Sequence, residues 1–299
     1  MSLNSAVTDR LLVAGLDPDD TERLVREAIA EDFRYGPDVT TSATVAAFRP
    51  DTTVTANVAA RQPGVLAGLP VALAVLDVMG ISVDAATPLA TDGDRINAGQ
   101  AVIRMSAPPA SLLSAERSVL NFLTHLSGIA TATRAWADAV SGTGAVVRDT
   151  RKTLPGLRLL QKYAVRCGGG ANHRFGLGDA ALIKDNHVVA AGGITAAIRA
   201  VREAAPDLPM EVECDTLAQV SEALAEGAGL ILLDNMNLAD MRAAVTLARA
   251  YPGAGLEASG GLQLANARAV AETGVDFLSV GSLTHSSPAL DLGIDLLDR

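Results

Sequence analysis

Residues 209–235 read PMEVECDTLAQVSEALAEGAGLILLDN, and the pattern in this stretch decides the fold. The apolar runs at 209–215 and 229–235 favour two short β-strands, and the amphipathic segment at 216–227 favours a helix between them. Two strands joined by one helix of this length are typical of parallel strands with a right-handed crossover. Each of the two predicted strands ends in polar residues.

The same alternation extends in both directions along the chain. Further apolar runs predict strands at 144–150, 180–186, 255–261 and 275–282. Further amphipathic segments predict helices at 155–169, 194–206, 237–253 and 262–274. No G-x-G-x-x-G follows the first of these strands, so the alternation favours a closed or nearly closed (β/α) barrel over an open Rossmann sheet.

The first 110 residues follow a different pattern. Strands are predicted at 53–61, 81–88 and 101–108, with a helix at 69–80. We therefore predict an α+β domain at 1–125 and a barrel domain at 126–285, bridged by a long helix at 111–140. The tail at 286–299 could return to pack on the first domain.

The composition argues against several classes of function. The chain has 24 Lys and Arg against 34 Asp and Glu, a formal charge of −10, and only 3% aromatic residues. It therefore lacks the basic surface and the stacking side chains of nucleic-acid-binding proteins. There is no signal-peptide pattern and no apolar run long enough to span a membrane. Cys167 and Cys214 have no metal-ligand spacing, so we expect free thiols and a cytoplasmic protein.

Positive charge nevertheless gathers in one part of the chain. Between Arg148 and His187 there are eight basic and three acidic residues, a net charge of +5. All three lysines of the chain, Lys152, Lys162 and Lys184, lie in this window. Because arginine supplies every other cation of the chain, the use of lysine here suggests a need for a compact ammonium group rather than a planar guanidinium group. The alternative is a solvated basic helix face.

The carboxyl ends of the predicted strands carry polar residues. In a (β/α) barrel these ends converge on one face, where the chemistry takes place. We expect Lys152 and Lys184 to project into that mouth, with Arg151, His173 and Arg174 on or next to the same face. The other strand ends supply Asp149, Thr150, Asp185, Asn186, Glu211, Glu213, Asp234, Asn235, Ser259, Gly260, Gly261, Gly281 and Ser282.

Two features of these strand ends indicate a phosphate and a cation. Glycine turns follow the last two strands, where backbone N–H groups and a helix N-terminus can cradle a phosphate. Glu213 and Asp234 on neighbouring strands suit a hard cation such as Mg²⁺. An ion pair of these acids with a lysine of the basic window is a compatible alternative. The many cations imply a ligand that includes both planar carboxylates and phosphates.

The basic window also carries a resemblance to a known family. RDTRKTLPGLRLLQKYAVRCGGGANHRFGLGDAALIKDNH at 148–187 closely resembles the quinolinate phosphoribosyltransferases. The resemblance spans nearly the whole chain, and it implies an N-terminal α/β sandwich joined to an incomplete (β/α) barrel in a homodimer. Other matching segments are DVTT at 38–41, ERSVLNFLTHLSGIAT at 116–131, EVECD at 211–215, LLDNM at 232–236, ASGG at 258–261 and VGSLTHS at 280–286.

The resemblance implies an activity and roles for the site residues. In that family quinolinate and phosphoribosyl pyrophosphate give nicotinate mononucleotide, pyrophosphate and carbon dioxide, with Mg²⁺. The implied carboxylate-binding residues are Arg151, His173 and Arg174, with Arg117 reaching the site of the partner subunit. Lys152 and Lys184 would lie between the two substrates, and Glu213 and Asp234 would hold ribose hydroxyls and Mg²⁺. The implied 5′-phosphate cradle is Ser259, Gly260, Gly261, Gly281 and Ser282, and Thr150 is a further substrate-binding residue.

Two rival functions remain open at this point. A nicotinate phosphoribosyltransferase of related fold would face one carboxylate, whereas the arginine and histidine cluster favours two. A non-catalytic phosphate-binding barrel would show ordered cations without turnover. The expected chemistry needs no thiol nucleophile, so Cys167 and Cys214 are interpreted as structural, and His125 as a packed or capping residue.

Overall fold

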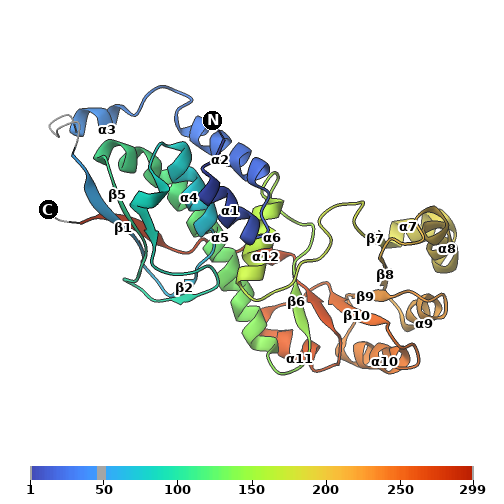
Figure 1. The fold of residues 1–299 in the computed structure, drawn as a ribbon. Coiled ribbons are helices and arrows are strands. Elements are labelled where there is room, and N and C mark those ends of the chain that lie inside the picture. The colour runs from blue at the N-terminus through green and yellow to red at the C-terminus, as the bar shows by residue number, and fades with distance from the viewer. Residues whose placement is uncertain (1, 46–51, 298–299) are drawn as a thin grey trace. The chain divides into compact units, whose positions relative to one another are not determined.

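The structure, a computed structural model, describes residues 2–45 and 52–297 and divides the chain into two compact units. The first unit comprises the described parts of Met1–Ala132, Leu154–Gly169 and Ser286–Arg299. The second comprises Thr133–Thr153 and Gly170–His285. Helix α5 (Pro109–Val140) is the long green helix of Figure 1, and it begins in the first unit and ends in the second.

The first unit combines small antiparallel sheets with helices. Its elements are α1 (Ser5–Val13), α2 (Pro18–Asp32), α3 (Val39–Thr44), β1 (Val54–Ala60), β2 (Gly64–Val65), α4 (Leu69–Val78), η1 (Val83–Ala85), β3 (Ala86–Pro88), β4 (Arg95–Ile96), β5 (Ala101–Ala107), α6 (Arg158–Cys167) and β12 (Leu292–Leu296). Four strands pair in the order β12-β1-β5-β3, and β2 pairs with β4. Helix α4 is apolar along nearly its whole length and is almost completely buried, because it has no polar face to offer solvent.

The C-terminal tail is an edge strand of the four-stranded sheet. Strand β12 runs antiparallel to β1, with Val58 opposite Ile294. Arg61 Nη2 lies 2.6 Å from Asp295 Oδ1 and links the end of β1 to β12. The described part of residues 286–299 therefore belongs to the first unit.

The boundaries of the two units differ from the predicted ones around helix α6. The sequence pattern placed this helix in the barrel at 126–285, whereas Leu154–Gly169 belongs to the first unit. The reason is a set of polar contacts to distant residues of that unit. Tyr163 donates a hydrogen bond to Asp92, Gln161 Nε2 lies 2.9 Å from His125 Nε2, and Arg166 Nη2 lies 2.9 Å from Ala14 O.

The second unit is a parallel sheet covered by helices. Its elements are β6 (Val146–Arg148), β7 (Ala181–Ile183), α7 (Asp185–Ala191), α8 (Ile194–Ala204), β8 (Met210–Cys214), α9 (Leu217–Ala225), β9 (Leu230–Asp234), α10 (Leu238–Ala248), β10 (Gly255–Ser259), η2 (Leu264–Asn266), α11 (Ala267–Ala271), β11 (Phe277–Ser279) and α12 (Ser282–His285). The six strands pair in the order β6-β11-β10-β9-β8-β7, and each neighbouring pair is parallel. Helices α8 to α11 pack along the outside of the sheet, as Figure 1 shows.

The two edge strands of this sheet, β6 and β7, are not joined to each other in the described residues. The segment that follows Gly170 runs along the free edge of β6 instead, where Ala171 forms a parallel bridge with Arg148. The barrel is therefore incomplete. The predicted fold class, an α/β chain with an N-terminal mixed domain and a parallel β/α domain, is confirmed.

Candidate active site

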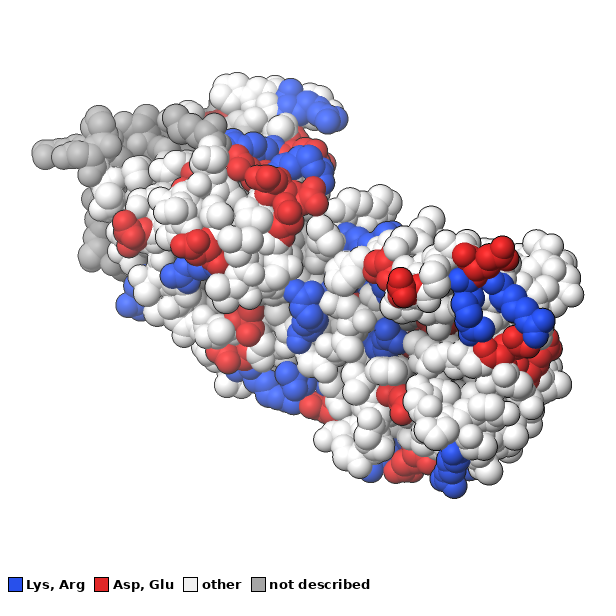
Figure 2. Space-filling model, turned by 45° about the vertical axis from the view of Figure 1, so that its right-hand side comes forward, with Lys and Arg blue, Asp and Glu red and all other residues white. Residues whose placement is uncertain are grey.

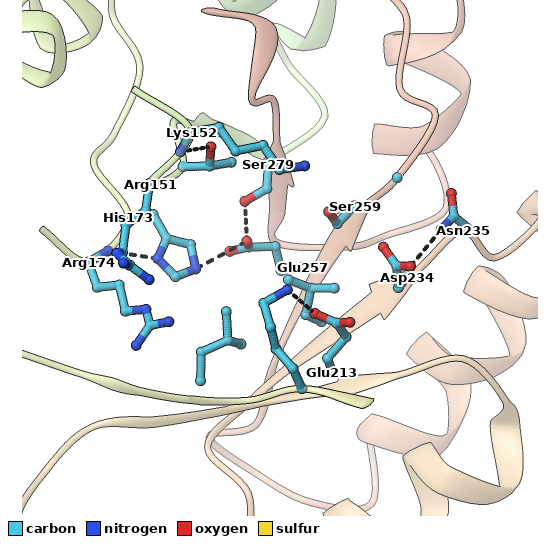
Figure 3. A pocket seen from close by; sticks show the side chains of 15 residues that line it. Arg151, Lys152, His173, Arg174, Glu213, Asp234, Asn235, Glu257, Ser259 and Ser279 are labelled. Carbon is cyan, nitrogen blue, oxygen red and sulfur yellow. Dashed lines mark hydrogen bonds and ion pairs between the residues drawn. The ribbon is translucent and has the colours of Figure 1, made fainter. Parts of the chain in front are cut away.

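A cavity of about 520 Å³ lies at the carboxyl ends of the parallel strands of the second unit, as Figure 3 shows. Most of the predicted site residues line it, although they are far apart in sequence, because parallel strands bring their carboxyl ends together. The predicted residues that line it are Thr150, Arg151, Lys152, His173, Arg174, Lys184, Glu213, Asp234, Ser259 and Gly260. It is also lined by Leu182, Leu232, Asn235, Glu257 and Ser279.

Lys184 and Glu213 form an ion pair at the mouth of this cavity. Lys184 directly follows β7, Glu213 lies near the end of β8, and Lys184 Nζ is 2.7 Å from Glu213 Oε2. The lysine side chain is 49% exposed. An ammonium has three donors, so one bond to Glu213 leaves donors for an incoming anion.

The turns after the last two parallel strands bring backbone close to the mouth. Gly260 has a φ of +81°, and a Cβ at that position would collide with the Asn235 side chain. At Gly281, an added Cβ would lie 3.0 Å from Lys152 Cδ. Gly261 follows Gly260 directly, and Ser282 is the first residue of α12, three residues after the end of β11. Gly261, Gly281 and Ser282 are not among the residues that line the cavity. Backbone N–H groups can therefore approach a ligand here, as the phosphate cradle predicted from the sequence requires.

Arg151 and Arg174 place two guanidinium groups on the cavity wall. The Nε atoms of both are buried and have no hydrogen-bond partner among the described residues. Burial lowers the pKa of Arg174, and the nearby charge of Arg151 lowers it further. Two cations held side by side in this way are stabilised by an anion that binds both.

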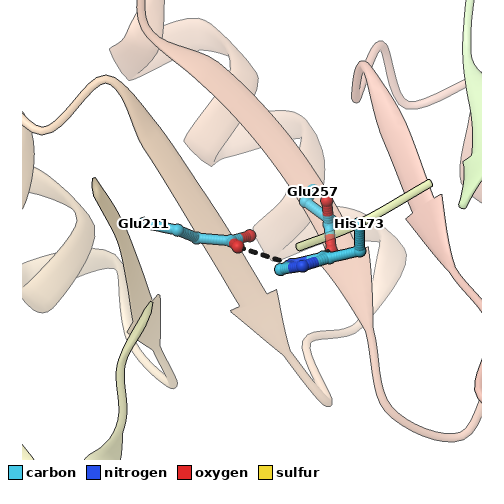
Figure 4. A group of neighbouring side chains, drawn as sticks. All are labelled: His173, Glu211 and Glu257. Atoms are coloured by element: carbon cyan, nitrogen blue, oxygen red, sulfur yellow. Dashed lines mark hydrogen bonds and ion pairs between the residues drawn. The ribbon is translucent and has the colours of Figure 1, made fainter. Parts of the chain in front are cut away.

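His173 belongs to a buried group with Glu211 and Glu257, which Figure 4 shows. His173 Nε2 lies 2.7 Å from Glu211 Oε2 and 3.6 Å from Glu257 Oε1. The backbone N–H of Arg174 donates to His173 Nδ1 at 2.7 Å, so Nε2 carries the proton that goes to Glu211. Both ring nitrogens are thus engaged within the protein. His173 lines the cavity, and the role implied for it from the sequence, holding a carboxylate, stays a prediction.

Glu257 is a cavity residue that the sequence analysis missed. It is fully buried in β10, where Arg148 Nη1 lies 2.5 Å from its Oε2 and the Ser279 hydroxyl donates to its Oε1. Burial raises the pKa of Glu257, and the charge of Glu211 raises it further. A charged residue within the apolar strand GLEAS, on the same face as Ser259, was the signal that could have identified it.

Two groups of acids could hold a cation, and their surroundings separate them. Both carboxylate oxygens of Glu257 in the buried group are bonded, to Arg148 and to Ser279, whereas among the described residues only Oε2 of Glu213 is bonded, to Lys184. Glu213 and Asp234 stand on neighbouring strands at the open mouth, with oxygen ligands facing the cavity. Mg²⁺ prefers a few carboxylate oxygens together with water and substrate phosphate oxygens. Glu213 and Asp234 are therefore the residues that fit Mg²⁺.

Arg117 lies on α5 within the first unit and is exposed. It lines a separate cavity of about 270 Å³, together with Asp32, Asp38 and Ser114. Ser114 Oγ donates to Asp38 Oδ2 at 2.9 Å, so the start of α3 is fastened beside the arginine. No ion pair or hydrogen bond of the Arg117 guanidinium is found within the described residues.

The positive charge of the basic window does not form a broad basic surface. On the face shown in Figure 2, Lys and Arg side chains lie close to Asp and Glu side chains. Both Lys152 and Lys184 of the window line the cavity instead. Within the described residues, no helix is both long and apolar enough to cross a membrane.

This chain is similar to known proteins over nearly its whole length. Residues 38–127 match the family described as quinolinate phosphoribosyl transferase, N-terminal domain, and residues 129–295 match its C-terminal domain. A nicotinate-nucleotide pyrophosphorylase [carboxylating] of Mycobacterium leprae is 55% identical over 275 residues, which is 91% of this chain and 95% of that protein.

Solved structures place the fold in the same group. The nicotinate-nucleotide pyrophosphorylase of Francisella tularensis has a TM-score of 0.87 at 39% identity, over 93% of this chain and 96% of that one. Human nicotinic acid phosphoribosyltransferase has a TM-score of 0.66 at 14% identity, over 87% of this chain and 73% of that one, and this likeness shows a shared fold alone. The two domain matches and the high identity across nearly the whole chain show that the chain belongs to the quinolinate phosphoribosyltransferase family.

Proposed function

We propose that this protein transfers the phosphoribosyl group of phosphoribosyl pyrophosphate to quinolinate and removes one carboxyl group. The products are nicotinate mononucleotide, pyrophosphate and carbon dioxide, a step of de novo NAD biosynthesis. The observation that carries the proposal is the cavity itself, where Arg151, Arg174 and Lys184 face Glu213 and Asp234. Such a cavity suits a dicarboxylate beside a phosphorylated sugar.

The two arginines are proposed to hold the quinolinate carboxylates. Their buried and unpartnered Nε atoms are donors in a planar fork, which matches the geometry of a carboxylate. Lys152 would contact carboxylate and phosphate oxygens between the two substrates, and Thr150 Oγ1 supports it by accepting the Lys152 backbone N–H at 3.0 Å. The dicarboxylate would be held with its ring nitrogen towards the sugar.

The phosphoribosyl group is proposed to lie across the ends of β9, β10 and β11. Its 5′-phosphate would be bound by Ser259, Gly260, Gly261, Gly281 and Ser282, where the glycine backbone approaches the mouth. Glu213 and Asp234 would hold the ribose hydroxyls and Mg²⁺. The ion, when bound, would neutralise the departing pyrophosphate.

The chemistry follows from orientation and fixed charge. The ring nitrogen attacks the anomeric carbon as pyrophosphate departs, through a state with positive charge on the sugar ring. Glu213 and Asp234 are placed to stabilise that charge. Once the nitrogen is ribosylated, the bond between the ring and the adjacent carboxylate can break. Carbon dioxide leaves, the electron pair stays on the ring carbon beside the positive nitrogen, and a proton from water then takes the place of the carboxylate. No covalent intermediate with the protein is needed.

The protein is further proposed to act as a homodimer in the cytoplasm, with Arg117 completing the quinolinate site of the partner subunit. Arg117 supports this proposal because it is exposed and its guanidinium has no partner within the described residues. A guanidinium left free in this way can bind a carboxylate brought by a second copy.

The test is turnover of the purified protein with quinolinate, phosphoribosyl pyrophosphate and Mg²⁺. Carbon dioxide and nicotinate mononucleotide should appear in equal amounts, and chelation of Mg²⁺ should abolish turnover until the ion is restored. Nicotinate serves as the parallel substrate. Equal activity with nicotinate would contradict the proposed substrate, and tight binding of both substrates without turnover would indicate a non-catalytic barrel.

A further inference from the structure

The segment that carries His173 and Arg174 lies along the free edge of β6. Ala171 N–H donates to Val147 O at 2.8 Å, and Asp149 N–H donates to Ala171 O at 3.2 Å. Beyond Ala171 no further strand pairing is present in this segment before β7. Something other than a sheet must therefore fix the backbone that presents Arg174 to the cavity.

Asp149 fixes the beginning of this segment. Its side chain is completely buried, and its Oδ1 accepts the backbone N–H of His173 at 2.9 Å. Its Oδ2 accepts from Asn172 Nδ2 at 2.5 Å. These two contacts define where the segment enters the site.

Asp179 fixes the other end. Its Oδ2 accepts the backbone N–H of Phe175 at 2.6 Å, and its Oδ1 accepts that of Gly176 at 2.8 Å. Desolvation raises the pKa of Asp179, but the backbone hydrogen bonds and the nearby charge of Arg174 outweigh it and hold the pKa below its ordinary value. The carboxylate is therefore ionised at neutral pH and closes residues 175–179 into a compact turn.

Arg174 lies between Asp149 and Asp179 in the sequence and forms an ion pair with neither in the described structure. Asp179 accepts a backbone N–H at each of its two oxygens, and its charge acts on the Arg174 guanidinium without a hydrogen bond between them. The guanidinium is instead fastened by one bond, from Nη1 to Ala180 O at 2.9 Å. Ala180 directly follows Asp179, so the turn that Asp179 closes also places the carbonyl that holds the arginine.

We propose that Asp179 is a positioning residue for the second carboxylate of the substrate, because it holds the turn that aims Arg174 into the cavity without forming an ion pair with that arginine. The inference rests on the proposed function and adds a specificity role to it. A dicarboxylate binds more tightly when the Arg174 guanidinium is fixed, because that group can bind its second carboxylate. A monocarboxylate that is bound by the other cations of the cavity depends less on Arg174. Asp179 should therefore favour quinolinate over nicotinate.

The test replaces Asp179 with Asn, which keeps the size of the side chain but removes its charge and one acceptor. The KM for quinolinate should rise by about 10-fold or more, as expected when one charge-assisted carboxylate contact is misaligned. The KM for phosphoribosyl pyrophosphate and the melting temperature should change little. The conservative variant Asp179→Glu should recover part of the loss, because it retains the carboxylate.

A matched control is Asp17→Asn. Asp17 is also an exposed carboxylate that accepts a backbone N–H, that of Asp20 at 2.9 Å, but it lies in the first unit. This variant should leave the KM for quinolinate unchanged. An Asp179→Asn variant with unchanged selectivity for quinolinate over nicotinate would overturn the inference. Equal losses for quinolinate and phosphoribosyl pyrophosphate would overturn it as well.

Calorimetric titration of quinolinate into each variant separates this inference from the proposed function. A wild type that binds quinolinate without turnover contradicts the proposed reaction, but weaker binding to Asp179→Asn would still support the positioning role. A wild type that neither binds nor turns over quinolinate overturns both.

Discussion

Lys184 Nζ lies 2.7 Å from Glu213 Oε2, so a cation from β7 and an acid from β8 hold each other at the mouth of the cavity. The two side chains have different proposed ligands. Lys184 would contact substrate anions, and Glu213 would contact ribose hydroxyls and Mg²⁺. The pair keeps both side chains in place in the unliganded protein. Lys184 has further donors with which to bind an anion while the pair stays intact, so the residue types at both positions should matter.

The exchange of Lys184 for Arg should be poorly tolerated. A guanidinium is planar and larger than an ammonium, so it cannot keep the contact to Glu213 and also turn towards a phosphate oxygen. We expect kcat/KM to fall on the order of 10- to 150-fold, the loss of one charge-assisted contact. Arg199→Lys, in the Arg199–Glu226 pair on the outer helices, makes the reverse exchange and should leave kcat/KM unchanged. Near-normal turnover of Lys184→Arg would show that the site does not need a lysine at this position.

Mixed dimers test whether Arg117 serves the partner subunit. Arg117→Ala and Lys152→Ala homodimers should each be nearly inactive yet folded, because each lacks a group of the proposed site. Mixing the two after dissociation should restore about one intact site per heterodimer, since one subunit supplies Arg117 and the other supplies Lys152. The measurement is turnover before and after subunit exchange. No recovery, with exchange verified by mass, would mean that Arg117 does not act across the dimer.

Both cysteine thiols should be unreactive in the folded protein. Burial raises the pKa of Cys167 to about 12, with a further contribution from Asp92, and burial likewise raises the pKa of Cys214 to about 12. Because the thiolate is the reactive form, only about one thiol in 10⁴ would be reactive at pH 8, against about a quarter for an ordinary thiol. A chromogenic disulfide reagent at pH 8 should label neither cysteine until denaturant is added. Rapid labelling of either residue in the native protein would contradict their structural role.

The Arg148–Glu257 pair should be needed for stability as a pair. Glu257 is fully buried and bonds to Arg148, so removing the acid alone leaves an uncompensated charge inside the protein. Glu257→Leu should lower the free energy of unfolding by about 3–5 kcal/mol, and the double variant Arg148→Met/Glu257→Leu should be less destabilised. Urea unfolding of the wild type, both single variants and the double variant measures this coupling. Purely additive losses would argue against a buried ion pair.

The predictability of the site varies from residue to residue for physical reasons. Lys184, Glu213 and Asp234 could be placed because parallel strands end on one face, so local pattern alone brings them together. Glu257 could not be placed as easily, because its partner Arg148 comes from a strand more than a hundred residues away and pairs with it only after folding. The sequence pattern placed helix α6 in the barrel for a similar reason, because the residues that hold it come from distant parts of the chain. Its contacts to Asp92 and His125 leave no trace in the helical pattern.

The sequence by itself determined the β/α alternation, the cations and acids at the strand ends, and the glycines of the turns, because these depend on short-range periodicity and backbone sterics. The tertiary structure decided how those groups are used. In the folded chain both ring nitrogens of His173 contact protein groups. Asp179 accepts a backbone N–H next to Arg174 and forms no ion pair with the Arg174 side chain. Such choices depend on which donors and acceptors meet once distant segments pack, and only the folded chain brings them together.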